Sequence, residues 1–328
     1  MSISCAPADL VRAAKCFPCV PRGARRWVRA YLLCQFAVRG IGPSAPVLDI
    51  SDASVLNNTI LTWTQASDPD TNQVWRSKNG GVFSLLATVA GGTVTYTDTD
   101  VMPLGDFWTY EVRGVKSGAI GNFSNTVSAA NNFSFAAQVT ASFPDLILCY
   151  NSFLGAGSVT LTSLSAPKLR RVFGNLDTNG ANLLASVNLS ALVRVNVNLN
   201  LNGSACTTLT FPKLILVGGA FDAGSSFSLT SISFAASPNF TTFLSVEFDA
   251  ALTTVSLFSS TFTNGCNMPN DACGFTQATV DAFLRRGVVS GLTTSFIDLS
   301  GGTSSAPSAA GLADKATLIG AGCTVITN

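Results

Sequence analysis

The chain has 328 residues, of which 47% are hydrophobic and only 11% are charged. It contains no histidine, so the commonest general base and the commonest metal ligand are both missing. Histidine-dependent catalysis is therefore excluded. A surface rich in Ser, Thr, Asn and Gly is typical of an extracellular or particle-bound β protein rather than of a cytosolic enzyme. No run of 18 apolar residues is present, and we expect no membrane insertion.

Positive charge is concentrated at the N-terminus. Residues 1–40 carry seven basic side chains and one acidic side chain, a balance of +6. The rest of the chain carries 12 basic and 17 acidic side chains, a balance of −5. The two regions are therefore expected to face different surroundings.

An apolar stripe of helical period runs from residue 24 to residue 38. It contains Trp27, Tyr31, Cys34 and Val38, and a helix this short must dock on a larger body to be stable. We interpret residues 1–42 as a basic helical segment that docks on an acidic protein surface, in preference to nucleic acid or an anionic membrane. The expected docking side chains are Arg22, Arg25, Arg26, Trp27, Arg29 and Tyr31.

Four cysteines lie in the same segment: Cys5, Cys16, Cys19 and Cys34. The pair at positions 16 and 19 has the CxxC spacing of zinc ligands and redox sites. The other two lie at irregular distances, and no βαβ pattern surrounds them, so buried free thiols are the preferred interpretation. The sequence leaves free, disulfide-bonded and zinc-bound states open, and we expect neither a cofactor nor a metal site.

Residues 43–131 predict a β-sandwich. Short strand-like runs are separated by turn signals at intervals near ten residues. The runs are 59–64, 72–77, 82–89, 93–98, 107–115 and 123–129.

This region resembles a fibronectin type III domain. The resemblance rests on the run Ile60-Leu61-Thr62-Trp63, on the hairpin at 73–81, on Tyr96-Thr97-Asp98, on the strand 110–115 that begins with Tyr110, and on Phe123-Ser124-Asn125. Members of that family are spacers and binding modules. The resemblance implies that Trp63 and Tyr110 are core and corner packing residues rather than ligand-binding residues.

Residues 132–328 predict a solenoid. Four similar segments, beginning at Leu164, Leu189, Phe211 and Phe234, follow one another at distances of 25, 22 and 23 residues. Such spacing is the signature of leucine-rich repeats, in which each repeat contributes one strand and stacking builds a continuous core. Alternating apolar residues between Val193 and Leu201 predict one of these strands. A generic β-sandwich is the alternative.

The C-terminal part predicts an α/β cap. We expect a helix capped by Thr276 and closed at Gly287, a strand at 295–299, a second helix at 309–319 and a last strand at 323–327. The fold class is thus mainly β: a helical anchor, a fibronectin-like sandwich and a leucine-rich-like solenoid with this cap. Cys266 and Cys273 are compatible with either a disulfide or a reduced pair.

Glu247 and Asp249 form the sharpest catalytic candidate. Residues i and i+2 of a strand share a face, and paired carboxylates hydrolyse glycosidic bonds. No neighbour is expected to raise the pKa of either carboxyl, so a solvated acidic strand face is preferred. We predict no enzyme activity.

The terminal segments resemble bacteriophage proteins. Residues 16–23 (CFPCVPRG) and 31–37 (YLLCQFA) resemble N-terminal segments of phage tail or appendage proteins, and the end of the chain, from Phe296, resembles that of repeat-bearing viral proteins. The resemblance implies a structural virion protein: a tail-fibre or receptor-binding appendage that docks on other virion proteins through residues 1–42. Its solenoid would bind a host surface glycan or protein.

The alternatives are a capsid decoration or head-fibre protein, a bacterial cell-surface adhesin and a polysaccharide-degrading enzyme. Because no secretory signal pattern is present, we expect release with a virus particle. A homo-oligomer is possible from the sequence, although no coiled-coil heptads are present.

Overall fold

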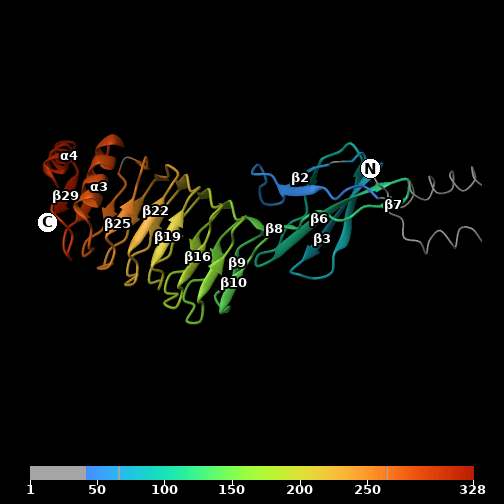
Figure 1. Cartoon of the computed structure of the whole chain (residues 1–328), viewed down its shortest axis with the longest axis horizontal. Coiled ribbons are helices and arrows are strands. Elements are labelled where there is room, and N and C mark those ends of the chain that lie inside the picture. Colours follow the sequence, from blue (N-terminus) through green and yellow to red (C-terminus); the bar gives the residue numbers. More distant parts are fainter. Residues whose placement is uncertain (1–41, 66, 264) are drawn as a thin grey trace, which may run out of the picture.

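The computed structural model describes residues 42–65, 67–263 and 265–328 as a mainly β chain with two helices in this part (Figure 1). Two packed sheets at the N-terminal side are followed by a β-solenoid of about six turns. The segment predicted to dock, residues 1–42, lies outside the described residues except for its last position, and so do all six of its docking side chains.

The N-terminal part consists of two antiparallel sheets. One contains β1 (Val47–Ile50), β2 (Thr59–Thr64) and β5 (Thr95–Asp98). The other contains β3 (Thr71–Lys78), β4 (Ser84–Ala90), β6 (Phe107–Lys116), β7 (Ala119–Ile120) and β8 (Val127–Ala130). The strand predicted at 59–64 has those bounds, whereas the last predicted strand begins at residue 127 instead of 123. Alternating apolar residues therefore located these strands well, and their ends less well.

Trp63 and Tyr110 both lie in the core between these two sheets, where they are 4% and 0% exposed. The Tyr110 hydroxyl donates a hydrogen bond of 2.9 Å to Asp98, and Arg76 forms an ion pair of 2.6 Å with the same carboxylate oxygen. This buried pair needs both partners, because removing either leaves an uncompensated charge in the core.

The solenoid is built from parallel strands on three sides. The first side contains β11 (Leu146–Cys149), β14 (Arg171–Val172), β17 (Arg194–Val195), β20 (Leu216–Val217), β23 (Asn239–Phe240) and β26 (Thr261–Phe262). The second contains β9 (Phe133–Ser134), β12 (Phe153–Leu154), β15 (Leu176–Asp177), β18 (Leu199–Asn200), β21 (Ala220–Asp222) and β24 (Phe243–Ser245). The third side is divided into two three-stranded sheets. One contains β10 (Thr140–Ser142), β13 (Ser163–Ser165) and β16 (Ser186–Asn188), and the other contains β19 (Thr208–Phe211), β22 (Ser231–Phe234) and β25 (Thr254–Ser256).

Strand partners on the first side are 22 or 23 residues apart, as from Leu148 to Arg171 and from Arg194 to Leu216. The sequence spacing therefore located the turns of the solenoid. The prediction of one strand per repeat is wrong, because each turn contributes three short strands. The alternation predicted as one strand between Val193 and Leu201 is divided into β17 and β18, with Val197 41% exposed between them. Apolar residues keep alternating in the sequence through this corner, but burial does not follow: Val195 and Leu199 are buried, and Val197 between them points outward.

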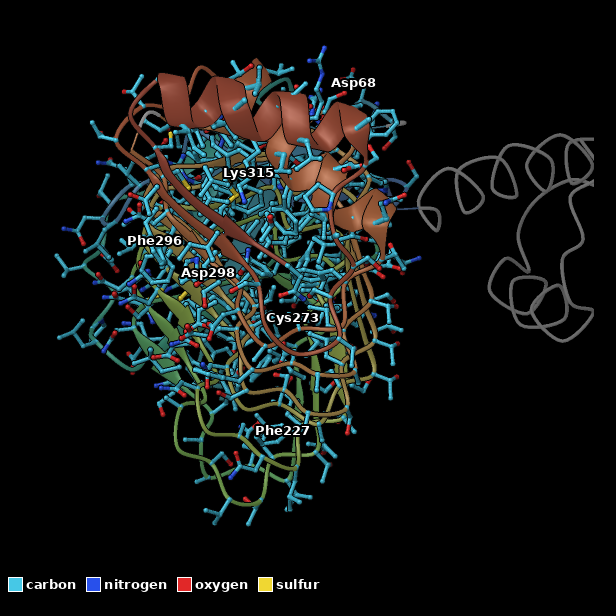
Figure 2. All side chains as sticks on the ribbon, turned by 90° about the vertical axis from the view of Figure 1, so that its left-hand side faces the viewer. Asp68, Phe227, Cys273, Phe296, Asp298 and Lys315 are labelled. Atoms are coloured by element: carbon cyan, nitrogen blue, oxygen red, sulfur yellow. The ribbon has the colours of Figure 1, made fainter. Side chains whose placement is uncertain are left out.

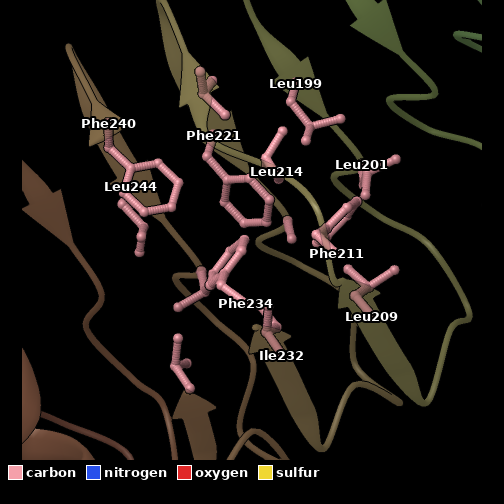
Figure 3. Packing of buried hydrophobic residues seen from close by; sticks show 14 of the residues in the cluster. Leu199, Leu201, Leu209, Phe211, Leu214, Phe221, Ile232, Phe234, Phe240 and Leu244 are labelled. Atoms are coloured by element: carbon pink, nitrogen blue, oxygen red, sulfur yellow. The ribbon is translucent and has the colours of Figure 1, made fainter. Parts of the chain in front are cut away.

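Leucine and phenylalanine side chains from successive turns form one continuous core (Figure 3). Phe211 and Phe234 are stacked with ring centroids 5.7 Å apart, and Phe221 meets Phe234 edge to face at 5.4 Å. Aromatic pairs in such geometries add stabilisation beyond the area they bury. No turn can bury its own apolar residues alone, so stacking provides the stability of the whole solenoid.

One strand belongs to both halves of the molecule. β8 pairs with β6 antiparallel and with β11 parallel, so one sheet continues from the N-terminal part into the solenoid. β1 and β2 reach over the outer face of this shared sheet: the Tyr150 hydroxyl is 2.7 Å from Thr59 Oγ1, and Arg170 forms an ion pair of 2.8 Å with Asp49. The two halves are therefore joined through backbone pairing as well as side chains.

The C-terminal end is closed by helices. It contains β27 (Met268–Pro269), α3 (Gln277–Val289), β28 (Phe296–Leu299), α4 (Ala309–Gly320) and β29 (Thr324–Thr327). Seen along the solenoid from this end, the helices lie on one side and Phe227 lies on the opposite side (Figure 2). The alternation of helices and strands confirms the predicted cap, with Thr276 as the N-cap of α3.

The first cap helix ends later than predicted. Gly287 is buried within α3, and the left-handed residue beyond the helix is Gly291, with φ of 67°. A left-handed glycine beyond the last turn ends a helix, whereas Gly287 allows close packing against Leu318. Cys266 and Cys273 are free, buried thiols.

Candidate recognition face

The third side of the solenoid presents two columns of small polar side chains, here called the hydroxyl face. The first column contains Thr140, Ser163, Ser186, Thr208, Ser231 and Thr254. The second contains Ser142, Ser165, Asn188, Thr210, Ser233 and Ser256. Eleven of the twelve carry a hydroxyl, one carries an amide, and none carries a charge.

Strand geometry explains why these side chains point outward. The residue between the two columns, such as Leu164, Leu209 or Ile232, is buried in the solenoid core. Neighbouring residues in a strand point to opposite faces, so both flanking residues face solvent. Within each of the two sheets, parallel strands set the columns' members about 4.8 Å apart, and the two columns lie about 7 Å from each other. The result is a grid in two parts of three rungs each, and its strands β10, β16, β19, β22 and β25 succeed one another in Figure 1.

The hydroxyls of the grid remain available for a ligand. Within the described residues, the only hydrogen bond made by any of the eleven hydroxyls is a 3.5 Å contact between Thr254 and Thr253. The amide exception is Asn188, whose side chain accepts a hydrogen bond from the Ser190 backbone. Exposed hydroxyls without protein partners can donate to and accept from a ligand without first breaking an internal bond.

The column just before the grid behaves differently. Thr162 and Thr230 each donate a hydrogen bond, of 3.0 and 2.9 Å, to a backbone carbonyl of the preceding turn. Thr253 does the same at 3.4 Å. These three hydroxyls connect one turn to the next. Whether a hydroxyl makes such a hydrogen bond or stays free therefore depends on its position in the turn.

The face has defined ends. At the C-terminal end α3 occupies the place where the next strand would lie, and Thr279 donates a hydrogen bond of 3.0 Å to the Thr253 carbonyl. At the other end β10 pairs only with β13 and is an edge strand. The face therefore has six rungs, three in each sheet, and each set of three spans about 10 Å at a spacing of about 4.8 Å.

The candidate acid pair is placed differently from the prediction. Glu247 and Asp249 follow β24 in a turn instead of sharing a strand face, and Asp249 is 0% exposed. The expectation of a solvated acidic strand face is therefore wrong, and so is the expectation that nothing raises a pKa there: burial raises the pKa of Asp249 to about 7. A carboxyl with no exposed surface cannot contact a polysaccharide, so the two do not form the open pair that glycoside hydrolysis needs.

The described residues contain neither a metal-binding cluster nor a membrane-spanning helix. Among them, no group of three or more His, Cys, Asp or Glu side chains is arranged to hold a metal ion. Of the helices in the described ranges, none is long and apolar enough to cross a membrane. The docking residues proposed from the sequence, from Arg22 to Tyr31, lie outside these ranges.

No protein-family model and no curated protein matches the chain. Among solved structures, it is similar to a Fn3-like protein from Clostridium thermocellum, with 27% identity over 27% of this chain and 91% of that chain, at a TM-score of 0.23. It is also similar to a pectate lyase from Erwinia chrysanthemi in complex with tetragalacturonic acid, with 13% identity over 78% of this chain and 84% of that chain, at a TM-score of 0.23.

A β-1,2-glucanase from Parabacteroides distasonis is 26% identical over 26% of this chain, at a TM-score of 0.24, and the chain spans 12% of that enzyme's length. Likenesses with TM-scores this low carry no functional argument.

The residue content of the solenoid predicts a face rich in hydroxyl and amide groups, but it does not predict which residues form that face. Their signal is a polar-apolar-polar triplet repeated every 22 or 23 residues: TAS at 140, SLS at 163, SVN at 186, TLT at 208, SIS at 231 and TVS at 254. The repeats predicted above begin at apolar residues within or directly after these triplets, so they do not mark the outward positions. The outward positions on either side of the central apolar residue define the two columns.

Proposed function

We propose that this chain is a recognition protein whose hydroxyl face binds a neutral, hydroxyl-rich partner, with a surface polysaccharide as the best fit. The observation that carries the proposal is the grid of eleven hydroxyls and one amide, free of charge and almost free of internal hydrogen bonds. Many individually modest hydrogen bonds repeated at a fixed interval suit a polymer that is itself periodic.

A non-enzymatic role is part of the proposal. What supports it is the burial of Asp249 and the absence of histidine from the whole sequence. The expected result is that the protein releases no reducing ends from polysaccharides it binds. Release that is abolished by Glu247→Gln would contradict this part and restore the polysaccharide-degrading alternative.

We propose further that the chain is a particle appendage, a phage tail fibre or receptor-binding protein, which docks through residues 1–42 and displays the solenoid. The N-terminal sheets would then act as a fibronectin-type spacer, and the cap as the end of the solenoid. The support is the charge asymmetry, +6 against −5, and the order of the parts along the chain. A decoration of the capsid would use the same arrangement.

The binding proposal is tested on an array of bacterial surface polysaccharides. The variant replaces Thr208, Thr210, Ser231 and Ser233 by alanine, and its matched control replaces the exposed Thr242, Ser259 and Thr261, which lie outside the face. Losing four hydrogen bonds of about 1 kcal/mol each should weaken binding far more than tenfold. Equal polysaccharide binding by the face variant and the wild type would contradict the proposal.

The location is tested by immunogold labelling of purified particles with an antibody against residues 137–328. Gold at the tail supports the appendage, and gold over the capsid supports a decoration protein. Absence from particles would favour a bacterial cell-surface adhesin.

A further inference from the structure

Two arginines stand side by side on the first side of the solenoid without a counter-ion. Arg171 on β14 and Arg194 on β17 are directly paired in register, and both belong to the outward-facing positions because Val172 and Val195 are buried. Neighbouring parallel strands place such residues about 4.8 Å apart, where like charges oppose folding.

No side chain of the described chain pairs directly with these two arginines. Neither guanidinium takes part in an ion pair or a hydrogen bond there, and the buried Nε of Arg171 has no acceptor. Asp52, whose charge acts on Arg171, is already engaged in an ion pair of 2.9 Å with Arg170. Burial and then the charge of Arg194 lower the pKa of Arg171, and the charge of Asp52 offsets this only in part.

The surroundings hold the arginines in position. The guanidinium carbon of Arg171 lies 4.1 Å from the ring centroid of Phe173. Phe173 itself packs against the core between the N-terminal sheets and the solenoid. A guanidinium stacked on a fixed ring has lost much of its freedom before a ligand arrives, so binding costs less conformational entropy. Asn196, two residues after Arg194 and therefore on the same face, adds an amide.

We propose that Arg171 and Arg194, with Phe173 and Asn196 beside them, form a binding site for an oxyanion carried by a ligand, a carboxylate or a phosphate. A guanidinium presents a planar fork of donors that matches both groups, and two forks side by side would neutralise one anion between them. This site lies on a different side of the solenoid from the hydroxyl face and goes beyond the neutral recognition proposed above. An acidic polysaccharide and a polyol-phosphate polymer are the two sources of such a group.

The test is isothermal titration of the full chain at low ionic strength with alginate oligomers, glycerol-phosphate oligomers and dextran. We expect binding of at least one anionic oligomer, weakened by added salt because exposed charges are screened, and no binding of dextran at this site. Binding of alginate alone assigns the carboxylate source, and binding of the glycerol-phosphate oligomer alone assigns the phosphate source. No binding of either anion by the wild type would overturn the proposal.

Variants decide whether these arginines are responsible. Arg171→Gln with Arg194→Gln should lose affinity for the anion at least tenfold, whereas Arg285→Gln, which removes an exposed arginine of α3, should not. An equal loss in the control would overturn the assignment. Thermal denaturation provides a second measurement that does not depend on the titration. The anion should raise the Tm of the wild type and leave the Tm of the double variant unchanged.

The alanine variant of the hydroxyl face provides the separation between the two proposals. It should bind the anionic oligomer as the wild type does. If that variant loses anion binding although its arginines are intact, the oxyanion site is not separate from the hydroxyl face. This conclusion holds whether or not the hydroxyl face binds a neutral polysaccharide.

Discussion

Asp249 accepts a hydrogen bond from the backbone N–H of Ser226, on the preceding turn of the solenoid, through one carboxylate oxygen. Its other oxygen is buried and has no hydrogen-bond partner among the described residues. Burial, opposed by the hydrogen bond from Ser226 and aided by the charge of Asp222, raises the pKa of Asp249 to about 7. Between about pH 4 and pH 7 the side chain is therefore protonated in the folded protein and ionised in the unfolded chain.

Stability should accordingly fall as the pH rises. A folded-state pKa above the unfolded value means that the folded protein binds the extra proton between about pH 4 and pH 7, and ionisation above pH 7 is penalised. We expect the free energy of unfolding to be about 2 kcal/mol larger at pH 5 than at pH 8 from this one residue. Urea denaturation at the two pH values measures the difference.

Asp249→Asn should remove most of this pH dependence, because the amide is neutral throughout. Glu247→Gln serves as the control: burial and the charges of Asp271 and Asp222 raise its pKa too, but it is only partly buried. A pH dependence that survives in Asp249→Asn and disappears in Glu247→Gln would show that the wrong carboxyl had been identified.

Left-handed residues form a column at one corner of the solenoid, and Phe248 is the one that fits this conformation worst. Gly157, Gly180 and Gly203 occupy the column in the early turns, followed by Ser225 and then Phe248, with φ of 62°. A bulky residue in this region costs about 1 kcal/mol that glycine does not.

Phe248→Gly should therefore be more stable than Phe248→Ala by about 1 kcal/mol. Both variants lose the half-exposed ring, so their difference isolates the backbone strain, and thermal denaturation of the pair measures it. If alanine is as stable as glycine, the corner can relax and stores no strain.

Sequence reasoning located what depends on spacing along the chain. The steps of 22 or 23 residues and the cap helix beginning after Thr276 required only periodicity and a capping side chain. It did not predict which residues are buried or which residues meet between turns. Val197 continues an alternating pattern yet lies at a corner, and Asp249 has the sequence neighbours of a surface acid yet is buried and bonded to Ser226 of the preceding turn. The pairing of Arg171 with Arg194 likewise needs the register between turns, which no local pattern supplies.

The phenylalanine core predicts a strong dependence of stability on position. Phe234 is 1% exposed between Phe211, Phe221 and Phe240, so Phe234→Ala should cost about 3 to 5 kcal/mol. Phe227 is 75% exposed in a neighbouring segment, and the same substitution there should change the free energy of unfolding by less than about 0.5 kcal/mol. Guanidinium chloride denaturation of both variants tests the pair. Similar losses at the two positions would contradict the burial described here.

The shared strand β8 predicts that the N-terminal sheets and the solenoid unfold together. Trp63, Trp75 and Trp108 lie in the N-terminal sheets, Trp27 lies outside the described residues, and the solenoid sequence contains no tryptophan. Tryptophan fluorescence therefore does not report on the solenoid. Circular dichroism in the far ultraviolet reports on both halves, and chiefly on the longer solenoid. Coincident transitions by the two probes are expected, since unfolding either half exposes the backbone of a common sheet. A fluorescence transition at lower denaturant concentration would show that the halves are independent.

The contact between Tyr150 and Thr59 provides a direct measure of that coupling. Their hydroxyls lie 2.7 Å apart in the core, one from the solenoid side and one from β2. Tyr150→Phe and Thr59→Val should each lower the free energy of unfolding by about 1 kcal/mol. The double variant should lower it by less than the sum of the two, because the second substitution removes a partner of a hydrogen bond that is already broken. Because this bond bridges the two halves, the double variant should also separate the fluorescence and dichroism transitions that coincide in the wild type. If the two changes in the free energy of unfolding are additive and the transitions still coincide, this hydrogen bond does not couple the halves. The continuous sheet is then the connection between them.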